Sequence, residues 1–374
     1  MPFLPLYFAE LGLNTTGSIA IWSGFSLGVT PAVTAAMAPV WARVADRVGR
    51  KLMVARSLGS FVVVMTALAY VDAPWQVFAL RVVQGLFAGY GPIVMTMAAE
   101  SAPPEHTAAA IGWVHTAQRL GPALGPVIGG TLAQAIGIRH TFLVSALFYL
   151  AAFALVVVVY REVERRPDAA SAVEPPATFR AVMAVPHFLL FMVAVFGLQL
   201  VDRSFGPILP LYLQEIGVAG DRVPFLAGTI FTLTAVAAAG GNQVAAALLG
   251  RTTVHTLVPA MAGVAAVAAF VFGLAAPVAA LVVVAIAFGL AMGVATTTVY
   301  AAVTEAVPPR ARGVAFGYLT SAYLVGLAAS PMIAGVLGAM SMRAVFLADA
   351  VGLGVLAWHV RKRMTERGHA VPAN

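Results

Sequence analysis

The sequence predicts an all-α, polytopic membrane protein, and its composition is the first reason. Of its 374 residues, 61% are apolar and 10% are charged, whereas a soluble domain carries about 45–50% apolar and about 25% charged residues. A water-soluble chain of this size could not bury so much apolar surface. The second reason is that the apolar runs are long, continuous and rich in Ala, Leu, Gly and Met, which favours spanning helices over the short alternating strands of a membrane barrel.

The rest of the composition argues against several classes of function. The net charge of +7 comes without a basic stripe interleaved with aromatic residues, so nucleic-acid binding is not expected. The chain has no cysteine, which excludes disulfides and Cys-ligated metals. Its seven histidines are scattered, with no Ser-His, His-Glu or paired-aspartate cluster, so neither a metal site nor an enzyme is predicted. The opening residues 1–13 lack the features of a signal peptide.

Eleven segments are long and apolar enough to span a bilayer, which takes roughly 20 apolar residues. They are 18–42, 52–71, 75–101, 108–135, 140–160, 186–213, 223–249, 254–275, 277–305, 311–339 and 343–360. The opening fragment 2–13 is apolar but too short to cross. We divide the chain into an N-terminal bundle (1–160), a Pro-rich charged linker (161–185), a C-terminal bundle (186–362) and a tail (363–374).

Basic residues orient these spans. If the loop 43–56 faces the cytoplasm, sixteen Lys and Arg residues lie on that side and only Arg139, Arg222 and Arg343 lie on the other. Lys and Arg favour the cytoplasmic side of membrane proteins, so this orientation is predicted. The linker 161–185 and the tail 363–374 are then cytoplasmic.

An internal repeat relates the two halves. The segment PFLPLYFAELGL at 2–13 matches PILPLYLQEIGV at 207–218, with seven of twelve residues identical at an offset of 205. Near the same offset, Glu100 matches Glu305, and Arg139 matches Arg343. Six spans in each half would give both halves the same orientation, as in a parallel repeat about an axis along the membrane normal.

The repeat also predicts that the first span lacks its cytoplasmic portion. About 20 apolar residues precede Pro207, whereas only Met1 precedes Pro2. A misassigned start codon or a truncation is the favoured explanation. A natural half-span is the alternative, and it would leave backbone ends unpaired at bilayer depth.

The first of three motifs is W-A-R-V-A-D-R-V-G-R-K at 41–51. Gly49 permits a tight turn between two helices. Asp46 lies among the cations Arg47, Arg50 and Lys51, where ion pairs could latch one helix to its neighbours. The alternative is an ordinary basic loop on the cytoplasmic side, but the order of the residues favours the latch.

The second motif is Leu80-Arg81-Val-Val-Gln84-Gly85, inside the span 75–101. An unpaired Arg within a bilayer costs at least about 2.5–3.5 kcal/mol, so we expect Arg81 to face a cavity and a carboxylate. Snorkelling to the interface is the alternative.

The third motif lies in the span 108–135 and is rich in glycine and proline. Its residues are Gly121, Pro122, Gly125, Pro126, Gly129 and Gly130. Glycines at 121, 125 and 129 form a groove on one helix face that lets a partner helix approach closely, and the prolines bend the helix. A tight seam of this kind would limit leakage between the bundles.

With these motifs in this order, the chain resembles the major facilitator superfamily, and within it the twelve-span drug:proton antiporter branch. That branch has G-x-L-A-D-R-x-G-R-[RK] between spans 2 and 3, L-x-x-R-x-x-Q-G in span 4 and G-x-x-x-G-P-x-x-G-G in span 5. Departures here are Ala42 and Val44 in the first motif. The resemblance implies two pseudo-symmetric six-helix bundles in the bacterial cytoplasmic membrane. It also implies that the first motif sets a conformational switch, that Arg81 takes part in proton coupling and that Gly121 to Gly130 form the seam.

Export against a gradient needs a group that binds a proton in one state and releases it in another. We therefore expect the proton as coupling ion, with no other cofactor, and a membrane-embedded carboxylate as its carrier. Asp202 shares a helix stripe with Gln199 and Arg203, in a span that borders the cavity in the family, so it is favoured. A structural ion pair with Arg203 is its alternative. Asp349, in the usually peripheral last span, ranks second.

Polar and aromatic side chains in four spans are candidates for the substrate cavity. They are His115, Gln118, Arg119, Gln199, Thr296, Tyr300, Tyr318 and Tyr323. A histidine such as His115 can equally be held by a neighbour in a structural hydrogen bond. The predicted function is proton-coupled export of small lipophilic molecules by a monomer through alternating access, with the lipid bilayer as its only other partner. A proton-coupled transporter of one metabolite, such as a sugar, is the alternative.

Overall fold

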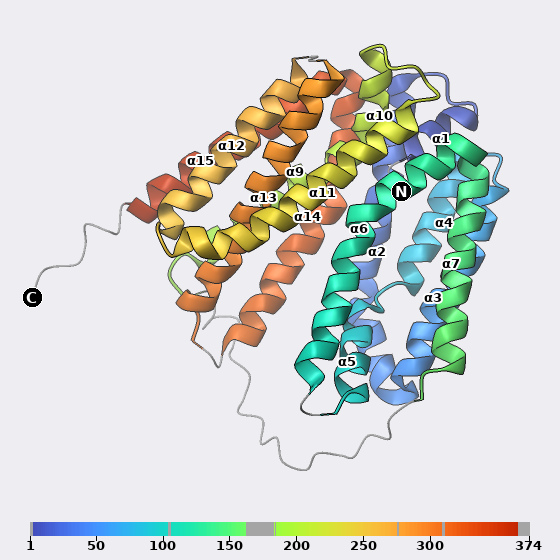
Figure 1. Cartoon of the computed structure of the whole chain (residues 1–374), viewed down its shortest axis with the longest axis horizontal. Coiled ribbons are helices and arrows are strands. Elements are labelled where there is room, and N and C mark those ends of the chain that lie inside the picture. Colours follow the sequence, from blue (N-terminus) through green and yellow to red (C-terminus); the bar gives the residue numbers. More distant parts are fainter. Residues whose placement is uncertain are drawn as a thin grey trace, which may run out of the picture.

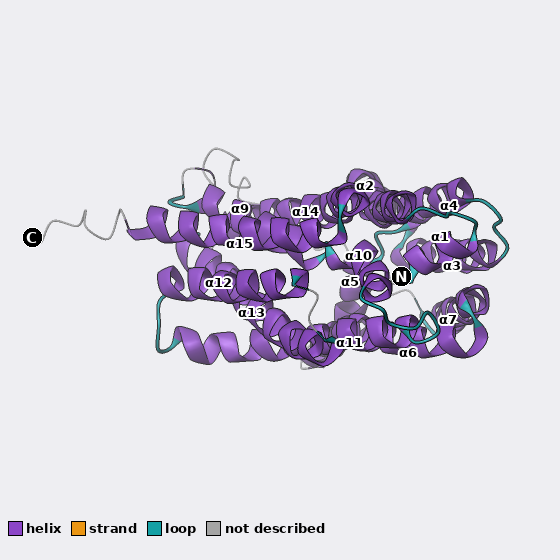
Figure 2. Ribbon diagram, turned by 90° about the horizontal axis from the view of Figure 1, so that it is seen from above, coloured by secondary structure: helices purple, strands orange, loops and turns teal. Residues whose placement is uncertain are grey.

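The computed structural model describes residues 3–103, 106–161, 183, 185–274, 277–308 and 311–365. Within these residues every regular element is a helix, as predicted (Figure 2). The helices of the first half gather beside those of the second half, and the two groups meet along one seam (Figure 1). Nine helices in the described ranges are long and apolar enough to cross a membrane, which agrees with a polytopic membrane protein.

Within the described residues, each half contains seven helices. The first half contains α1 (Leu4–Glu10), α2 (Thr16–Val48), α3 (Arg50–Ala69), α4 (Pro74–Phe87), α5 (Gly91–Ser101), α6 (Thr107–Ile136) and α7 (Ile138–Val158). The second contains α9 (Phe188–Asp202), α10 (Phe205–Glu215), α11 (Val223–Leu249), α12 (Val254–Gly273), α13 (Val278–Ala306), α14 (Arg312–Met340) and α15 (Met342–Thr365). The helix α15 runs past the expected bundle boundary at 362. Most of the predicted linker and tail (162–182, 184 and 366–374) lies outside the described residues.

Two predicted spans are broken in the middle, which corrects the prediction of continuous helices there. The segment 75–101, here called span 4, forms α4 and α5 with a break at 88–90, where Gly89 has a φ of 100°. The segment 186–213, here called span 7, forms α9 and α10 with a break at Arg203 and Ser204. Gly89 and the polar residues Arg203 and Ser204 lie at these breaks, but each segment is apolar enough on average to be taken as one span.

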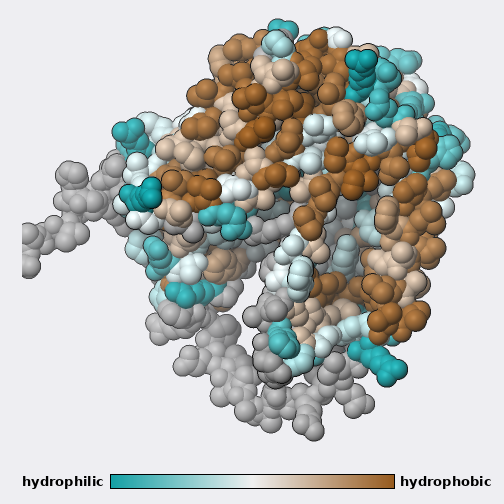
Figure 3. Space-filling model, viewed as in Figure 1, coloured by the Kyte–Doolittle hydropathy of each residue, from teal (hydrophilic) through white to brown (hydrophobic). Residues whose placement is uncertain are grey.

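The surface of the molecule matches a lipid environment. Large apolar side chains such as Phe148, Val283 and Val351 are exposed on the outer faces of the helices. Apolar side chains cover much of the face drawn in Figure 3, and the surface is hollowed between the two halves near the end that carries α5. Since lipid solvates apolar surface, this exposure needs no protein partner.

The repeated segment that contains α1 makes the same contacts in both halves. The Tyr7 hydroxyl donates to the Leu68 carbonyl at 2.5 Å, and its ring packs edge-on against Phe142 with 5.1 Å between centroids. In the second half, the Tyr212 hydroxyl donates to the Phe272 carbonyl and its ring packs against Phe346 at 4.9 Å. The pseudo-symmetry inferred from the sequence therefore extends to individual hydrogen bonds.

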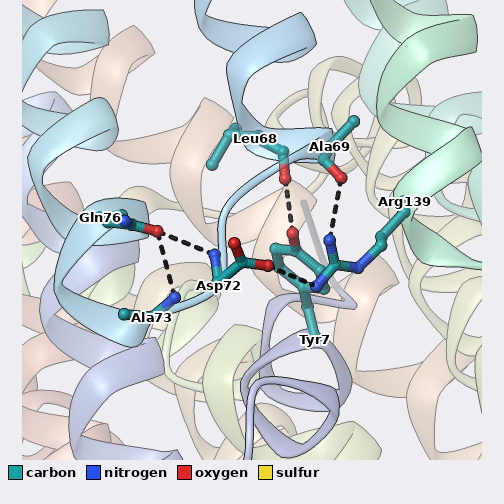
Figure 4. A network of polar contacts seen from close by, with 7 residues as sticks. All are labelled: Tyr7, Leu68, Ala69, Asp72, Ala73, Gln76 and Arg139. Carbon is teal, nitrogen blue, oxygen red and sulfur yellow. Dashed lines mark hydrogen bonds and ion pairs between the residues drawn. The ribbon is translucent and has the colours of Figure 1, made fainter.

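A polar network surrounds Tyr7 (Figure 4). Arg139 donates to the Ala69 carbonyl at 3.3 Å and lies 3.7 Å from the Asp72 carboxylate. The Gln76 side chain accepts from the backbone N–H of Asp72 and Ala73. These contacts fasten α1 to the turn between α3 and α4 and to the start of α7, so the short first helix is held as part of its bundle.

We predict that Tyr7→Phe lowers the free energy of unfolding by about 1–3 kcal/mol, because it leaves the buried Leu68 carbonyl without its donor. Denaturant titration of the purified protein in detergent micelles measures this loss. Tyr70→Phe is the control, since Tyr70 is 68% exposed. Equal losses in the two variants would show that the hydrogen bond does not hold α1.

Candidate functional site

The two bundles close against each other where α6 crosses α11. The Pro126 carbonyl faces Gly228, and Gly130 faces the Pro224 carbonyl. A Cβ atom at either glycine would lie less than 3.0 Å from the facing oxygen, so only glycine permits this approach. The backbone N–H of Val127 also donates across the crossing to the Thr232 hydroxyl at 3.2 Å.

A second crossing, between α2 and α14, repeats these contacts. The Pro331 carbonyl faces Gly24, and Gly335 faces the Ala20 carbonyl, again too close for a Cβ atom. Pro331 and Gly335 stand 205 residues after Pro126 and Gly130, the offset of the sequence repeat. Sequence reasoning identified only the first crossing, although the offset could have revealed the second.

The tight seam is shorter than the motif predicts. Gly129 lies against the Phe3 ring, and Gly130 forms the crossing, but a Cβ atom at Gly121 or Gly125 would meet nothing within 4 Å. Pro122 is exposed as well. The bundles are therefore closed at the Gly130 end of α6 and apart at its Gly121 end. In the predicted orientation, the closed end is periplasmic and the hollow is cytoplasmic.

Arg81 is buried within span 4 and held by oxygen acceptors. Its Nε donates to the Ser26 carbonyl at 3.0 Å, and its Nη1 donates to the side chain of Gln84. Its own carbonyl accepts from the Thr30 hydroxyl at 2.8 Å. The second motif thus joins α4 to α2, and the side chain stays 8% exposed rather than snorkelling to an interface.

The broken end of α4 is capped by side chains that the sequence reasoning did not single out. Thr34 donates to the Gly85 carbonyl at 3.3 Å and Trp41 to the Leu86 carbonyl at 2.6 Å. Arg56 donates to the Phe87 carbonyl at 3.2 Å, and its guanidinium lies 3.5 Å from the centre of the Trp41 ring. These donors replace the helical N–H groups that the break removes.

The first motif lies at the junction of α2 and α3. Gly49 has a φ of 91°, so the tight turn uses the freedom of glycine as predicted. Arg50 forms an ion pair with Glu100, the repeat match of Glu305, at the end of α5. Arg47 is exposed and Lys51 is half-buried. The Asp46 side chain lies outside the described residues.

The two intramembrane carboxylates differ in their surroundings. Asp202 forms an ion pair with its neighbour Arg203 at 3.1 Å, and its side chain is 31% exposed. Asp349 is only 8% exposed and is hydrogen-bonded at 2.5 Å to the Ser204 hydroxyl, at the break in span 7. Asp349 is therefore the more buried of the two acids, and Asp202 is held in the ion pair with Arg203 that the sequence offered as its alternative.

The cavity candidates are only partly brought together. Tyr323 interacts with Arg203 and lies near Tyr300, whose ring stacks on Phe316 at 6.1 Å. Gln199 is 9% exposed and carries a buried amide nitrogen without a partner in the described part of the chain. Thr296 and Tyr318 are half-buried, and Gln118 is exposed. The side chains of His115 and Arg119 lie outside the described residues.

Two bundles that close at one end and part at the other, with polar groups at broken helices between them, have the architecture of secondary transporters. The model of the Major Facilitator Superfamily matches residues 1–278 and 224–373, and the chain belongs to that superfamily.

Two similar relatives are named Multidrug resistance protein MdtG, from Serratia proteamaculans (strain 568) and Yersinia enterocolitica serotype O:8. Each is 33% identical to this chain over 240 residues, which is 64% of this chain and 58% of the relative. The matched part therefore spans less than two thirds of these relatives.

A solved structure shares the fold. The crystal structure of a bacterial homolog to the human lysosomal transporter Spinster, in an inward-facing and unoccupied conformation, superposes with a TM-score of 0.78 at 16% identity. The superposition covers 100% of this chain and 94% of that one. At this identity the likeness concerns the fold alone.

We predict that Gly130→Ala weakens closure at the α6–α11 crossing. Alanine gains about 0.8–1.0 kcal/mol in helix propensity, but the clash with the Pro224 carbonyl costs about 1–3 kcal/mol. Nitroxide labels on Asn14→Cys and Ala219→Cys, in the loops before α2 and α11, measure the separation of the bundles. The separated population should increase.

Gly121→Ala is the matched control, because a Cβ atom there meets nothing within 4 Å. Its label separation should equal that of the unsubstituted protein. An equal change in both variants would mean that glycine is not needed for close packing at the crossing.

Proposed function

We propose that the chain is a proton-driven exporter of small lipophilic molecules in the bacterial cytoplasmic membrane. The observation that carries this proposal is the pair of glycine crossings, which seal one end of a hollow that is open at the other. Reversing that arrangement would move a bound molecule from one side to the other without an open pore. The lipid bilayer is its only proposed partner, and the protein acts as a monomer.

The crossings and the first motif would alternate as gates. In the present arrangement, α6–α11 and α2–α14 are closed, and the Arg50–Glu100 ion pair joins α3 to α5 within the first half. Opening the crossings and bringing the cytoplasmic ends together would expose the hollow to the periplasm. Gly49 would act as the turn about which the first motif rearranges.

The substrate class follows from the lining and the relatives. Tyr300, Phe316 and Tyr323 offer aromatic surface, and the neighbouring Arg203 is paired with Asp202, which suits lipophilic molecules better than sugars. Aromatic lining can accept many shapes at moderate affinity. The relatives' name, Multidrug resistance protein, favours drugs over a single metabolite.

Protons would supply the energy. One pH unit across the membrane is worth about 1.4 kcal/mol per proton, and 100 mV adds about 2.3 kcal/mol. The intramembrane groups proposed to take part are Arg81, Asp202 and Asp349. No other cofactor is proposed.

Ethidium accumulation tests the proposal. Efflux-deficient bacteria that produce the chain should accumulate several-fold less ethidium than cells with an empty vector, and a proton uncoupler should remove the difference. Gly130→Ala should reduce the protection and Gly121→Ala should not, for the reason given above. Equal accumulation with and without the uncoupler, or uptake of a single sugar without drug protection, would contradict the proposal.

A further inference from the structure

Ser204 stands in the break of span 7 and contacts two acceptors at once. Its hydroxyl lies 2.8 Å from the Val201 carbonyl in the last turn of α9 and 2.5 Å from Asp349 Oδ2 on α15. The Ser204 backbone N–H also reaches the Val201 carbonyl, at 3.3 Å. Ser330 of α14 donates to the neighbouring Leu200 carbonyl. Side-chain hydroxyls therefore cap the broken end of α9.

Counting protons defines two states of this cluster. A serine hydroxyl has one proton to donate and accepts through its lone pairs. If Ser204 donates to the Val201 carbonyl, its bond to Asp349 requires a proton on the carboxyl. If Asp349 is ionised, Ser204 must donate to it instead, and the Val201 carbonyl keeps only the longer bond from the backbone. Both bonds at once correspond to a protonated Asp349.

Four of the charged residues near Asp349 in the fold are held in ion pairs with one another. The helices packed against α15 are α9, α10, α12 and α14. Their titratable side chains, with those of α15 itself, are Asp202, Tyr212, Glu215, His255, Arg312, Tyr318, Tyr323, Arg343, His359, Arg361, Lys362 and Arg363. Asp202 pairs with Arg203, and Glu215 lies 4.0 Å from Arg343 at the helix ends. Within the described residues, Ser204 is the hydrogen-bond partner recorded for Asp349.

The break connects this cluster to the bundle interface. Beyond Ser204, α10 packs against α1 and α2 of the first bundle as well as against α11, α14 and α15 of its own. Gly206, two residues after Ser204, lies against Leu27 of α2. Leu27 precedes Gly28, which faces Ala328 and Met332 of α14 at the second crossing. A change in the angle between α9 and α10 therefore acts directly on a gate contact.

We propose that Asp349 and Ser204 form a proton-operated hinge in span 7. A proton on Asp349 leaves Ser204 free to cap α9, which stabilises the present break and the closed crossings. Loss of that proton gives a carboxylate that takes the Ser204 hydrogen bond, weakens the cap and lets α10 move away from α1 and α2. The inference deepens the proposed function, because it identifies where the coupling proton is held.

The chain has no cysteine, so the Asn14→Cys/Ala219→Cys label pair can be used without background in the otherwise unchanged protein. In reconstituted membranes without substrate, raising the pH should shift the labels from a short to a long separation with one midpoint. Asp349→Asn, which keeps a donor to Ser204 and cannot ionise, should stay at the short separation at every pH.

Ser204→Ala should move the midpoint by about one pH unit, the size expected from one hydrogen bond to a charged group. Two variants serve as controls and should keep the original midpoint. Asp72→Asn removes an acid whose side chain is 87% exposed. Ser145→Ala removes a hydroxyl that, like that of Ser204, donates to a carbonyl of its own helix, here Thr141 at 2.9 Å. Ser145 occupies the position in the first half that matches Asp349 in the repeat.

Infrared spectra of the unsubstituted protein give a second readout that does not depend on how well Asp349→Asn folds. A protonated carboxyl band should disappear over the same pH range as the label change, and Ser204→Ala should shift its frequency. The proposal would be overturned if Asp349→Asn or Ser204→Ala kept the original midpoint. It would also be overturned if the pH-dependent change were lost in Asp202→Asn alone. These measurements use no drug, so failure of ethidium export would count against the proposed function and not against the hinge.

Discussion

The backbone of a membrane protein must satisfy its own hydrogen bonds, because lipid offers neither donors nor acceptors. Where a spanning helix is interrupted, side chains have to supply the hydrogen bonds that the helix no longer makes. At the end of α4 these are Thr34, Trp41 and Arg56, and at the end of α9 they are Ser330 and Ser204. Polar groups that would be costly elsewhere in a span are thus required at these two points. The buried ionisable groups Arg81 and Asp349 lie beside these caps. The need to cap the broken helices therefore determines where polar side chains occur within the spans.

A second constraint acts between the bundles. Lipid tails are as apolar as the helix surfaces, so helices associate through van der Waals contact and occasional hydrogen bonds rather than through the hydrophobic effect. Glycine strengthens the van der Waals contact between two helices, because without a side chain their backbones can touch. The repeat supplies two such crossings, with Gly130 and Gly228 in one and Gly335 and Gly24 in the other. Because both crossings join the same two bundles, separating the bundles would open both.

Sequence reasoning predicted what depends on composition and repetition. Hydropathy gave the helical membrane fold, and the motif in α6 pointed to the crossing at Gly130. Both breaks were missed, because the segments around residues 88–90 and around the polar pair Arg203 and Ser204 remain apolar on average. The burial of Asp349 was not expected either. Asp349 was judged peripheral from its span number, whereas the break in span 7 turns Ser204 toward it. The Arg50–Glu100 pair joins residues fifty positions apart, which no local pattern reports.

The sizes of the forces show how much of the conformational switch one proton can drive. Closure rests on dispersion contacts, each worth about 0.1–0.2 kcal/mol, and on one recorded hydrogen bond between the bundles, from Val127 to Thr232, worth about 0.5–1.5 kcal/mol. In the proposed alternation, contacts broken at the periplasmic face would be replaced by others at the cytoplasmic face, so only the difference between the two arrangements has to be supplied. A shift of two states from 1:99 to 99:1 takes about 5.5 kcal/mol, and one pH unit with 100 mV supplies about 3.7 kcal/mol per proton. One proton therefore supplies about two thirds of the free energy that such a shift takes, and two protons exceed it.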